Sequence, residues 1–243
     1  MTLQDAIKIR RSRRKYIPEP LKSSSEVSLQ ELIDEYNNKE NLDIRLVVDN
    51  GKAFEGLRKS YGMFSGVRNY IGLIECKADP VYLEKLGYYG ELLILHATAL
   101  GLGTCWVGGT FHRASCPFNL SQGESIHCVI TVGRVQEKLS KREKFIYKLT
   151  HRKSKIAEQM YTSDSPTPDW FLSGMKAVEL APSAVNRQPV MFTYKDGIVT
   201  ASVKDITGEG LALDLGIAKL HFELGAGGGT WEFGNNKRFT KAE

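Results

Sequence analysis

The sequence predicts an α+β fold made of two related halves, and three observations support this prediction. The chain has 243 residues, 42% hydrophobic and 25% charged, so it can bury the core of one large domain or two small ones. Helical and strand patterns occur on both sides of a polar, proline-containing stretch at 162–168. Some of these patterns recur in the same order, which favours a duplication. We therefore expect a first half at 1–161, a linker at 162–168 and a second half at 169–243, together forming one compact unit.

Capping residues predict where the helices of the first half begin. Thr2 followed by Asp5 is typical of a helix N-terminus, and Ser28 with Glu31 forms a second capping pattern. The elements expected in the first half are a helix starting near Leu3, helices at 28–37, 52–60, 80–100 and 153–161, and strands at 43–48, 69–75 and 126–132.

The longest helix is expected to start at Asp79-Pro80 and to end at Gly101. Gly87 and Gly90 lie inside it, and each costs about 1 kcal/mol relative to alanine, so we expect close packing against another element to compensate. The following segment, Gly101–Gly109, is expected to be a loop because glycine recurs in it.

The second half repeats parts of this pattern. The elements expected in it are helices at 169–180 and 211–224, a hairpin of strands at 190–195 and 198–204, and a last strand at 230–233. The hairpin turns at Asp196-Gly197, where the first half has Asn50-Gly51 after its first strand. Leu86-Gly87 recurs as Leu215-Gly216, and each pair is followed by a glycine-rich stretch with Thr and Trp.

Cysteine and histidine spacing argues against a metal centre, and we nominate no metal ligand. The four cysteines form no CxxC pair and no clustered histidine joins them, so free thiols in a reducing compartment are expected. The N-terminus lacks the apolar core of a signal peptide, and the longest apolar stretch contains charged residues. These features predict a cytoplasmic protein with no membrane partner.

The positive charge is concentrated in one short segment. Residues 1–22 carry the whole net charge of +5, and a second basic stretch lies at 134–155. Arg10 and Arg14 are four residues apart and Arg11 and Arg14 three apart, so one helical turn could direct several guanidinium groups at one anion. A solvated basic arm or a nucleic-acid patch would have the same composition.

A proline-bracketed loop at 181–189 places short polar side chains at Ser183, Asn186 and Gln188. Such a loop is rigid and can present amide groups outward. The paired glycines Gly108 and Gly109 would allow a flat ligand to approach the backbone closely. Neither pattern identifies a ligand by itself.

Three motifs together resemble the FMN-dependent nitroreductase family. The first is Arg10-Arg11-Ser12-Arg13-Arg14-Lys15-Tyr16, and the second is Gly101–Gly109. The third is Ala181-Pro182-Ser183-Ala184-Val185-Asn186-Arg187-Gln188-Pro189. This third motif is similar to the family's A-P-S-x-x-N-x-Q-P loop. The segments Val132–Arg134 and Ser140–Arg142 resemble its late strand and basic segment.

The order of the motifs departs from ordinary members of that family, which are dimers that share this loop between subunits. Here the loop follows the arginine motif by about 170 residues, and the expected place at 37–41 lacks it. The order therefore resembles the tandem-duplicated, single-chain nitroreductases, in which one chain imitates the dimer.

The resemblance implies an FMN-dependent oxidoreductase that takes electrons from NADH or NADPH and reduces a small acceptor, such as a nitro compound or quinone, by a ping-pong mechanism. The cofactor carries this chemistry, so we nominate no catalytic side chain. Its binding residues would be Arg10, Arg11, Ser12, Arg14, Lys141 and Arg142 at the phosphate, with Val107, Gly108, Gly109, Pro182, Ser183, Ala184, Asn186 and Gln188 around the ring system.

Two alternatives remain at this stage: a flavin-binding sensor or store without turnover, and a small nucleic-acid binder that uses the basic arm. The second is disfavoured because only Tyr16 interleaves an aromatic ring with that arm. The duplicated arrangement further predicts one FMN per chain and a monomer that is competent to bind it.

Overall fold

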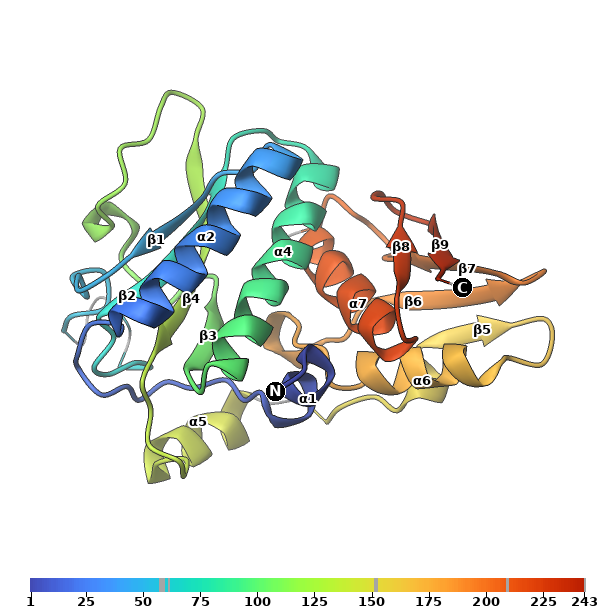
Figure 1. The fold of residues 1–243 in the computed structure, drawn as a ribbon, viewed down its shortest axis with the longest axis horizontal. Coiled ribbons are helices and arrows are strands. Elements are labelled where there is room, and N and C mark those ends of the chain that lie inside the picture. Colours follow the sequence, from blue (N-terminus) through green and yellow to red (C-terminus); the bar gives the residue numbers. More distant parts are fainter. Residues whose placement is uncertain (57–59, 61, 151–152, 209, 243) are drawn as a thin grey trace. The chain divides into compact units, whose positions relative to one another are not determined.

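The computed structural model describes residues 1–56, 60, 62–150, 153–208 and 210–242, and it divides into two compact units (Figure 1). Their segments are Met1, Ile9–Ala78 and Leu93–Leu149 in unit 1, and Thr2–Lys8, Asp79–Leu92 and Thr150–Glu243 in unit 2. The predicted boundary at 162–168 stays a prediction, although residues 162–163 lie in a strand and not in a linker. No helix in the described part of the chain is long and apolar enough to cross a bilayer.

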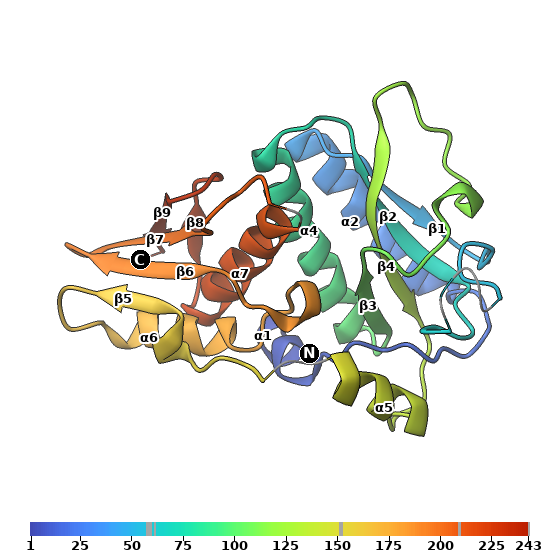
Figure 2. The ribbon, with the colours of Figure 1, turned by 180° about the vertical axis from the view of Figure 1, so that it is seen from behind.

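Unit 1 contains a four-stranded antiparallel sheet in the order β1-β2-β4-β3. Its strands are β1 (Ile44–Val47), β2 (Asn69–Glu75), β3 (Gly103–Val107) and β4 (Ser125–Gly133). Helix α2 (Ser23–Glu40) covers one face of this sheet (Figures 1 and 2) and buries Leu29, Ile33 and Tyr36 along one side. The long helix α4 (Pro80–Ala99) and helix α5 (Lys141–Thr150) also have residues in this unit.

Unit 2 contains a five-stranded sheet in the order β5-β6-β7-β9-β8. Its strands are β5 (Tyr161–Ser163), β6 (Met191–Lys195), β7 (Ile198–Ser202), β8 (Gly229–Trp231) and β9 (Lys237–Lys241). Only the β5–β6 pair is parallel. Helices α6 (Asp169–Val178) and α7 (Leu211–Gly225) pack together beside it, while α1 (Leu3–Ile9) belongs mainly to this unit. Its core is rich in aromatic rings, including Phe171, Phe192, Phe222, Trp231 and Phe239.

The two sheets share one strand order. In unit 1 the order is β1-β2-β4-β3 with α4 between β2 and β3 in the sequence, and in unit 2 it is β6-β7-β9-β8 with α7 between β7 and β8. A helix precedes the first strand in both cases, α2 in one and α6 in the other. The recurring turn and glycine patterns of the sequence therefore fall at matching places in two sheets of equal topology.

Two glycines allow α4 and α7 to approach closely within unit 2. A Cβ added to Gly87 would lie 2.2 Å from the carbonyl oxygen of Leu213, and one added to Gly216 would lie 1.9 Å from that of Glu84. Each glycine thus meets the residue three positions before the other. Reciprocal contacts of this kind characterise two-fold packing. The expected compensation for Gly87 is confirmed, and both Leu-Gly pairs lie inside their helices.

Two buried polar pairs also join α4 to α7. The Lys219 ammonium donates to Glu84 Oε1 at 2.6 Å, and His221 Nε2 lies 3.0 Å from Glu91 Oε1. All four side chains are fully buried. The Lys219 ammonium also donates to two backbone carbonyls, so its hydrogen-bonding capacity is satisfied inside the protein.

Most of the predicted elements are confirmed. They are the helices at Leu3, 80–100, 169–180 and 211–224, and the strands at 43–48, 69–75, 126–132, 190–195 and 198–204. The Asp79 cap is also present, since Val81 N donates to its carboxylate at 2.9 Å. These elements have strong local signals: a cap with proline, a glycine end, or alternating apolar residues.

Several predictions about the first half were wrong. Helix α2 begins five residues before the predicted Ser28, because its buried side extends back to Ser25. Residues 52–56 form no helix, 57–59 lie outside the described residues, and Ser60, the last residue of the predicted helix, is helical. The segment predicted as a loop contains β3, because pairing with β4 determines its conformation.

The other errors lie nearer the C-terminus. A 3₁₀ turn at Ala157–Gln159 and strand β5 replace the helix predicted at 153–161. The predicted last strand is followed by another strand, β9. Helix α5 was missed, although Ser140 followed by Glu143 is itself a capping pattern.

Candidate functional site

The arginine motif of unit 1 is an extended segment, not a helical turn. Helix α1 ends at Ile9, and Ser12 then forms a parallel bridge with Thr104 of β3. Arg13 N donates to the Thr104 carbonyl at 2.8 Å. The predicted convergence through helical spacing was therefore wrong. In an extended chain alternate residues share a side, which groups Arg10 and Arg14 with Ser12.

The thiol of Cys105 in β3 is influenced by all three of these side chains. Burial raises the pKa of this thiol, while the charge of Arg14, a hydrogen bond with Ser12 and the charge of Arg10 act in the opposite direction. The Cys105 side chain is almost completely buried, with 2% of the residue exposed. The Ser12 hydroxyl thus lies at this thiol, and the positive charges of Arg10 and Arg14 act on it.

Two polar atoms of Arg14 and Thr104 lack a hydrogen-bond partner in the described part of the chain. They are Arg14 Nε and Thr104 Oγ1, and both are buried. Buried polar atoms are nearly always hydrogen-bonded, and an exception needs an explanation. An anion held by this segment would satisfy the Arg14 donor, so the residues present fit a phosphate group.

Arg13 has a different environment from its neighbours. Its Nε donates to Glu143 Oε1 at 3.1 Å, a second guanidinium nitrogen donates to the Gln136 carbonyl at 2.8 Å, and its side chain is buried. Tyr16 is also buried, and its hydroxyl donates to the Arg13 carbonyl at 2.8 Å. The aromatic ring of this segment is therefore not available for stacking on a base, which argues against the nucleic-acid alternative.

Glu143 accepts five hydrogen bonds, three from this segment and two from Ser140. Its Oε1 accepts from the backbone N–H groups of Arg14 and Lys15 at 2.9 and 3.2 Å, in addition to the Arg13 bond. Its Oε2 accepts from the N–H and hydroxyl of Ser140, both at 2.8 Å. Burial opposes ionisation of this carboxyl, but these donors outweigh it and lower the pKa of Glu143 to about 2.

The three other predicted phosphate residues are more exposed. Arg11 is exposed and donates to the carbonyl of Arg10 at 2.9 Å. Lys141 and Arg142 occupy the first turn of α5, and the Arg142 guanidinium donates to the carbonyl of Gly62. The first turn of α5 is linked to the arginine segment by Glu143, so the two basic segments are neighbours within unit 1.

The paired glycines follow β3 directly. Val107 is buried as the last residue of the strand, while Gly108 and Gly109 are exposed. A Cβ added to either glycine would meet nothing within 4 Å, and neither has a positive φ. Neither packing nor backbone conformation of the described residues requires glycine here, which fits a surface that a ligand approaches closely.

The loop of unit 2 has an unusual backbone. Val185, Asn186 and Gln188 have φ values of 46°, 54° and 45°, in the left-handed region. For a β-branched residue such as Val185 this conformation is strained, and such strain is concentrated at functional sites. The Val185 side chain is 53% exposed and has no packing role that would explain it.

Gln188 supports this loop from beneath and does not point outward as predicted. Its side-chain oxygen accepts from Lys155 N at 2.7 Å, its amide nitrogen donates to the Glu179 carbonyl at 3.0 Å, and its backbone N–H donates to Ser183 Oγ at 2.8 Å. Asn186 is partly exposed and donates to Ser154 Oγ at 3.3 Å. Pro182 and Ala184 provide exposed or partly exposed backbone beside Ser183.

Asp214 of α7 is a second support of the loop. Both of its carboxylate oxygens lie within hydrogen-bond distance of Ala184 N, at 3.0 and 3.3 Å, and the residue is 4% exposed. Burial raises the pKa of Asp214 to about 7, against the effects of the Ala184 N–H and of the Arg187 charge. Asp214 also lines a small cavity with Pro182, Ser183 and Gln188.

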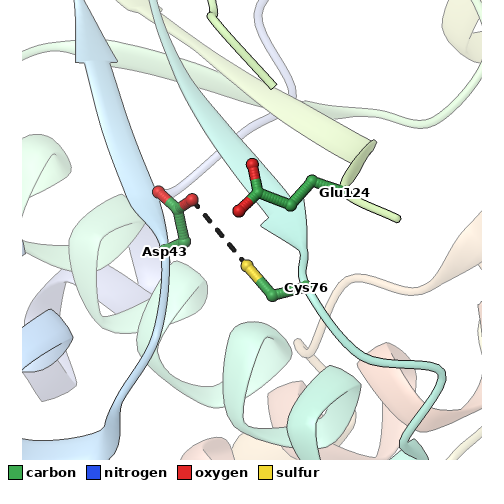
Figure 3. A group of neighbouring side chains, drawn as sticks. All are labelled: Asp43, Cys76 and Glu124. Carbon is green, nitrogen blue, oxygen red and sulfur yellow. Dashed lines mark hydrogen bonds between the residues drawn. The ribbon is translucent and has the colours of Figure 1, made fainter. Parts of the chain in front are cut away.

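One further cluster of ligand-type side chains lies in unit 1, outside the predicted site. Asp43, Cys76 and Glu124 point toward one another, and the Cys76 thiol donates to Asp43 at 3.8 Å (Figure 3). Arg45 lies 2.5 Å from Asp43 and 3.6 Å from Glu124. Its guanidinium already neutralises the carboxylates, so the cluster is explained as an ion-pair network.

Comparison with known proteins identifies the family. The family model described as "Putative TM nitroreductase" matches residues 2–226. The chain belongs to this nitroreductase family. No curated protein matches the sequence.

Solved structures of nitroreductases are similar to the chain. A "putative nitroreductase" from Thermotoga maritima MSB8 has 20% identity and a TM-score of 0.65, covering 98% of this chain and 92% of that one, so the two share a fold. An FMN-dependent nitroreductase from Clostridium difficile R20291 has 19% identity and a TM-score of 0.44 over 60% of this chain and 96% of that one. A nitroreductase with bound FMN from Bacteroides fragilis NCTC 9343 has 15% identity and a TM-score of 0.42 over 58% and 95%.

Sequence reasoning missed two buried carboxylates of this nitroreductase-family chain, Glu143 and Asp214. The capping pattern of Ser140 and Glu143 could have drawn attention to the first. Asp214 lies in an apolar helical stretch, and an isolated acid there was a signal of a buried, bonded carboxylate.

Proposed function

We propose that this chain is an FMN-dependent oxidoreductase that uses NADH or NADPH to reduce a small acceptor, such as a nitro compound or quinone, in ping-pong order. Membership of a nitroreductase family supports the general activity. The observation that carries the cofactor is the grouping of Arg10, Ser12 and Arg14 on one side of an extended segment, with the buried Arg14 Nε left without a partner among the described residues.

In this proposal Arg14, Arg10 and Ser12 bind the phosphate monoester, and Arg11, Lys141 and Arg142 add positive charge nearby. Guanidinium groups suit this task because they form paired, charge-assisted hydrogen bonds with phosphate oxygens. Val107 ends the strand at the point where Gly108 and Gly109 present bare backbone to the ring system. The flavin, when bound, supplies the two-electron redox chemistry.

The loop of Pro182, Ser183, Ala184, Asn186 and Gln188 belongs to unit 2, and its contribution to flavin binding is a prediction from the sequence motif. The strained backbone supports a functional role for this loop. Gln188 would act by holding the loop, since its amide is already bound to Lys155 and Glu179. Asn186 is the more accessible of the two amides.

Two measurements test the activity. The absorbance spectrum of the purified protein, with mass identification of the released cofactor, should show FMN. Anaerobic stopped-flow mixing with NADH and with NADPH should then bleach the bound flavin within seconds with at least one donor. Retention of oxidised flavin with both donors would overturn the enzyme proposal and leave the flavin sensor or store.

We also propose that the chain arose by tandem duplication and binds one FMN as a monomer. The shared strand order and the reciprocal glycine contacts support the duplication. The arginine segment occurs once, and β9 carries Lys237, Arg238 and Lys241 in comparison. The paired glycines that follow β3 have no counterpart directly after β8, where Glu232 and Phe233 follow. The measurement combines flavin absorbance per polypeptide with the molecular mass from light scattering. It should give one flavin per monomeric chain. Two flavins per chain, or flavin binding by a dimer alone, would refute this proposal.

A cytoplasmic location remains a proposal. All four cysteines are free, as expected in a reducing compartment.

A further inference from the structure

Two basic segments of unit 1 are predicted to bind the phosphate, and they lie far apart in the sequence. The first is the extended segment Arg10–Arg14, and the second is the start of α5, with Lys141 and Arg142. For both to bind one phosphate, something must fix the first relative to the second. The described side chains that join them are Glu143 and its partners.

Each oxygen of the Glu143 carboxylate serves one segment. Oε1 accepts the N–H groups of Arg14 and Lys15 and the Nε of Arg13, while Oε2 accepts the N–H and hydroxyl of Ser140 at the start of α5. The carboxylate is 3% exposed, so these bonds form away from water. A rigid side chain that accepts five donors therefore links the two segments.

The contacts on either side of Arg14 determine where its guanidinium points. The peptide N–H groups of Arg14 and of Lys15 both donate to Oε1, which fixes the backbone at the Arg14 Cα. The Arg13 side chain is drawn to the carboxylate and away from the Ser12 side. Arg14, whose Nε lacks a partner among the described residues, is thus held apart from Arg13; its guanidinium carbon lies 6.0 Å from the centre of the Phe64 ring, and its charge acts on the Cys105 thiol.

We infer that Glu143 is a positioning residue that holds the arginine segment and the start of α5 in register, so that the chain discriminates flavins by their phosphate. The inference rests on the proposed function. Glu143 itself repels a phosphate, so its effect on binding is through Arg14, Lys141 and Arg142. Preorganised donors bind an anion better than mobile ones, because less ordering is needed on binding.

The test compares the dissociation constants of FMN and of riboflavin, measured by fluorescence titration of the flavin-free full chain. The ratio of the two constants reports phosphate discrimination and cancels effects on the ring site. Glu143→Gln keeps the size and shape of the side chain but removes its charge. It also replaces one hydrogen-bond-accepting oxygen by an NH2 group, which then faces other N–H or O–H donors. Glu137→Gln removes the same charge from an exposed position on the same connection and serves as the matched control.

We expect wild type and Glu137→Gln to prefer FMN strongly. Glu143→Gln should reduce this preference by about tenfold or more, with riboflavin affinity changed by less than about threefold. An unchanged preference in folded Glu143→Gln overturns the positioning role and leaves the proposed function intact. Equal binding of both flavins by wild type, or no binding, overturns the proposed function itself.

A milder variant covers the case in which Glu143→Gln does not fold, as judged by circular dichroism. Ser140→Ala removes one hydrogen bond to Oε2 and keeps the carboxylate charge. It should reduce the preference for FMN by about threefold, less than Glu143→Gln, because the carboxylate charge and the other four hydrogen bonds to it remain. A folded Ser140→Ala chain with wild-type preference then overturns the inference.

Discussion

The two sheets have the same strand order, but they differ at their edges. In unit 1 the arginine segment lies beside β3 through the bridge of Ser12 with Thr104, so cationic side chains follow the edge that leads to Gly108. In unit 2 the additional strand, β5, lies beside β6 at the opposite edge, and β8 pairs only with β9 in the described part of the chain. The same strand order thus carries different added segments at its edges, and the cationic side chains of the proposed binding site belong to such a segment.

The two units also differ in the buried carboxylate that supports their predicted flavin-binding elements. Glu143 has five donors and a pKa of about 2, so it is charged at all ordinary pH values. Asp214 accepts a hydrogen bond from the Ala184 N–H and is influenced by the charge of Arg187, but burial outweighs both and its pKa is about 7. The number of hydrogen-bond donors decides whether burial leaves a carboxylate charged or neutral.

The largest expected effect follows from Asp214. Because its folded-state pKa lies above the ordinary value of 3.8, the folded chain binds the extra proton, and the associated stability is present at acid pH and is lost as the pH rises to about 7. Asp214→Asn mimics the protonated acid. The free energy of unfolding of Asp214→Asn minus that of wild type should increase by roughly 3 kcal/mol from pH 5 to pH 8, because only wild type loses stability over this range.

Urea unfolding of both proteins at these two pH values checks this prediction. Glu143 contributes with the opposite sign, because its stability is lost only as the pH falls from about 4.5 toward 2. It therefore does not interfere between pH 5 and 8. A constant difference between Asp214→Asn and wild type would show that Asp214 stays charged in the folded chain.

The next largest effect concerns the arginine segment. Arg14→Ala should weaken FMN by one to two decades relative to riboflavin, because a charge-assisted contact is worth roughly 1.5–3 kcal/mol. Arg238→Ala removes an arginine from the corresponding sheet of unit 2 and is the control. Isothermal titration with both flavins measures the difference; equal losses for FMN and riboflavin in Arg14→Ala would mean that this cluster does not bind the phosphate.

A pair of glycine substitutions separates packing from ligand access. Gly87→Ala forces a methyl group against Leu213 and should destabilise the fold by about 1–3 kcal/mol. Gly108→Ala meets open space, so its stability should change by less than about 0.5 kcal/mol while flavin affinity falls. Thermal unfolding and flavin titration of both variants decide this, and a Gly108→Ala chain with normal flavin binding would contradict the proposed close approach.

The smallest expected change in stability is that of Asn186→Ala in the unit 2 loop. The side chain is partly exposed and makes a long contact with Ser154, so unfolding should change by within about 0.5 kcal/mol. Flavin affinity or redox potential should change nevertheless. If thermal stability collapses while bound flavin behaves normally, the loop has a structural role only.

The sequence predicted elements that carry their own signals and failed where distant partners decide. Asp79-Pro80 and Asp196-Gly197 located a helix start and a hairpin turn correctly. Strand β3 looked like a loop because Gly103 lacks a side chain, but the site of that missing side chain is filled by Arg13 and Val135, which are remote in sequence. Local patterns cannot show such packing.

The candidate site shows the same limit. The residue types at 10–14, 108–109 and 182–188 could be selected from the sequence, whereas the alternation of Arg10, Ser12 and Arg14 depends on pairing with Thr104. The inward orientation of Gln188 depends likewise on Lys155 and Glu179. Side-chain direction follows from the conformation of the backbone, which was predicted as helical for the arginine segment and is extended.

The buried pairs between α4 and α7 bear on the history of the chain. If the reciprocal contacts of Gly87 and Gly216 define equivalent positions, the counterpart of Lys219 is Gly90 and that of Glu84 is Leu213. Two copies of α4 packed in the same way would bury Glu84 against a glycine, and an unpaired buried charge costs about 3–5 kcal/mol. If the chain arose by the proposed duplication, such substitutions would prevent separate halves from forming a stable symmetric dimer again, and the joining of the halves would be irreversible.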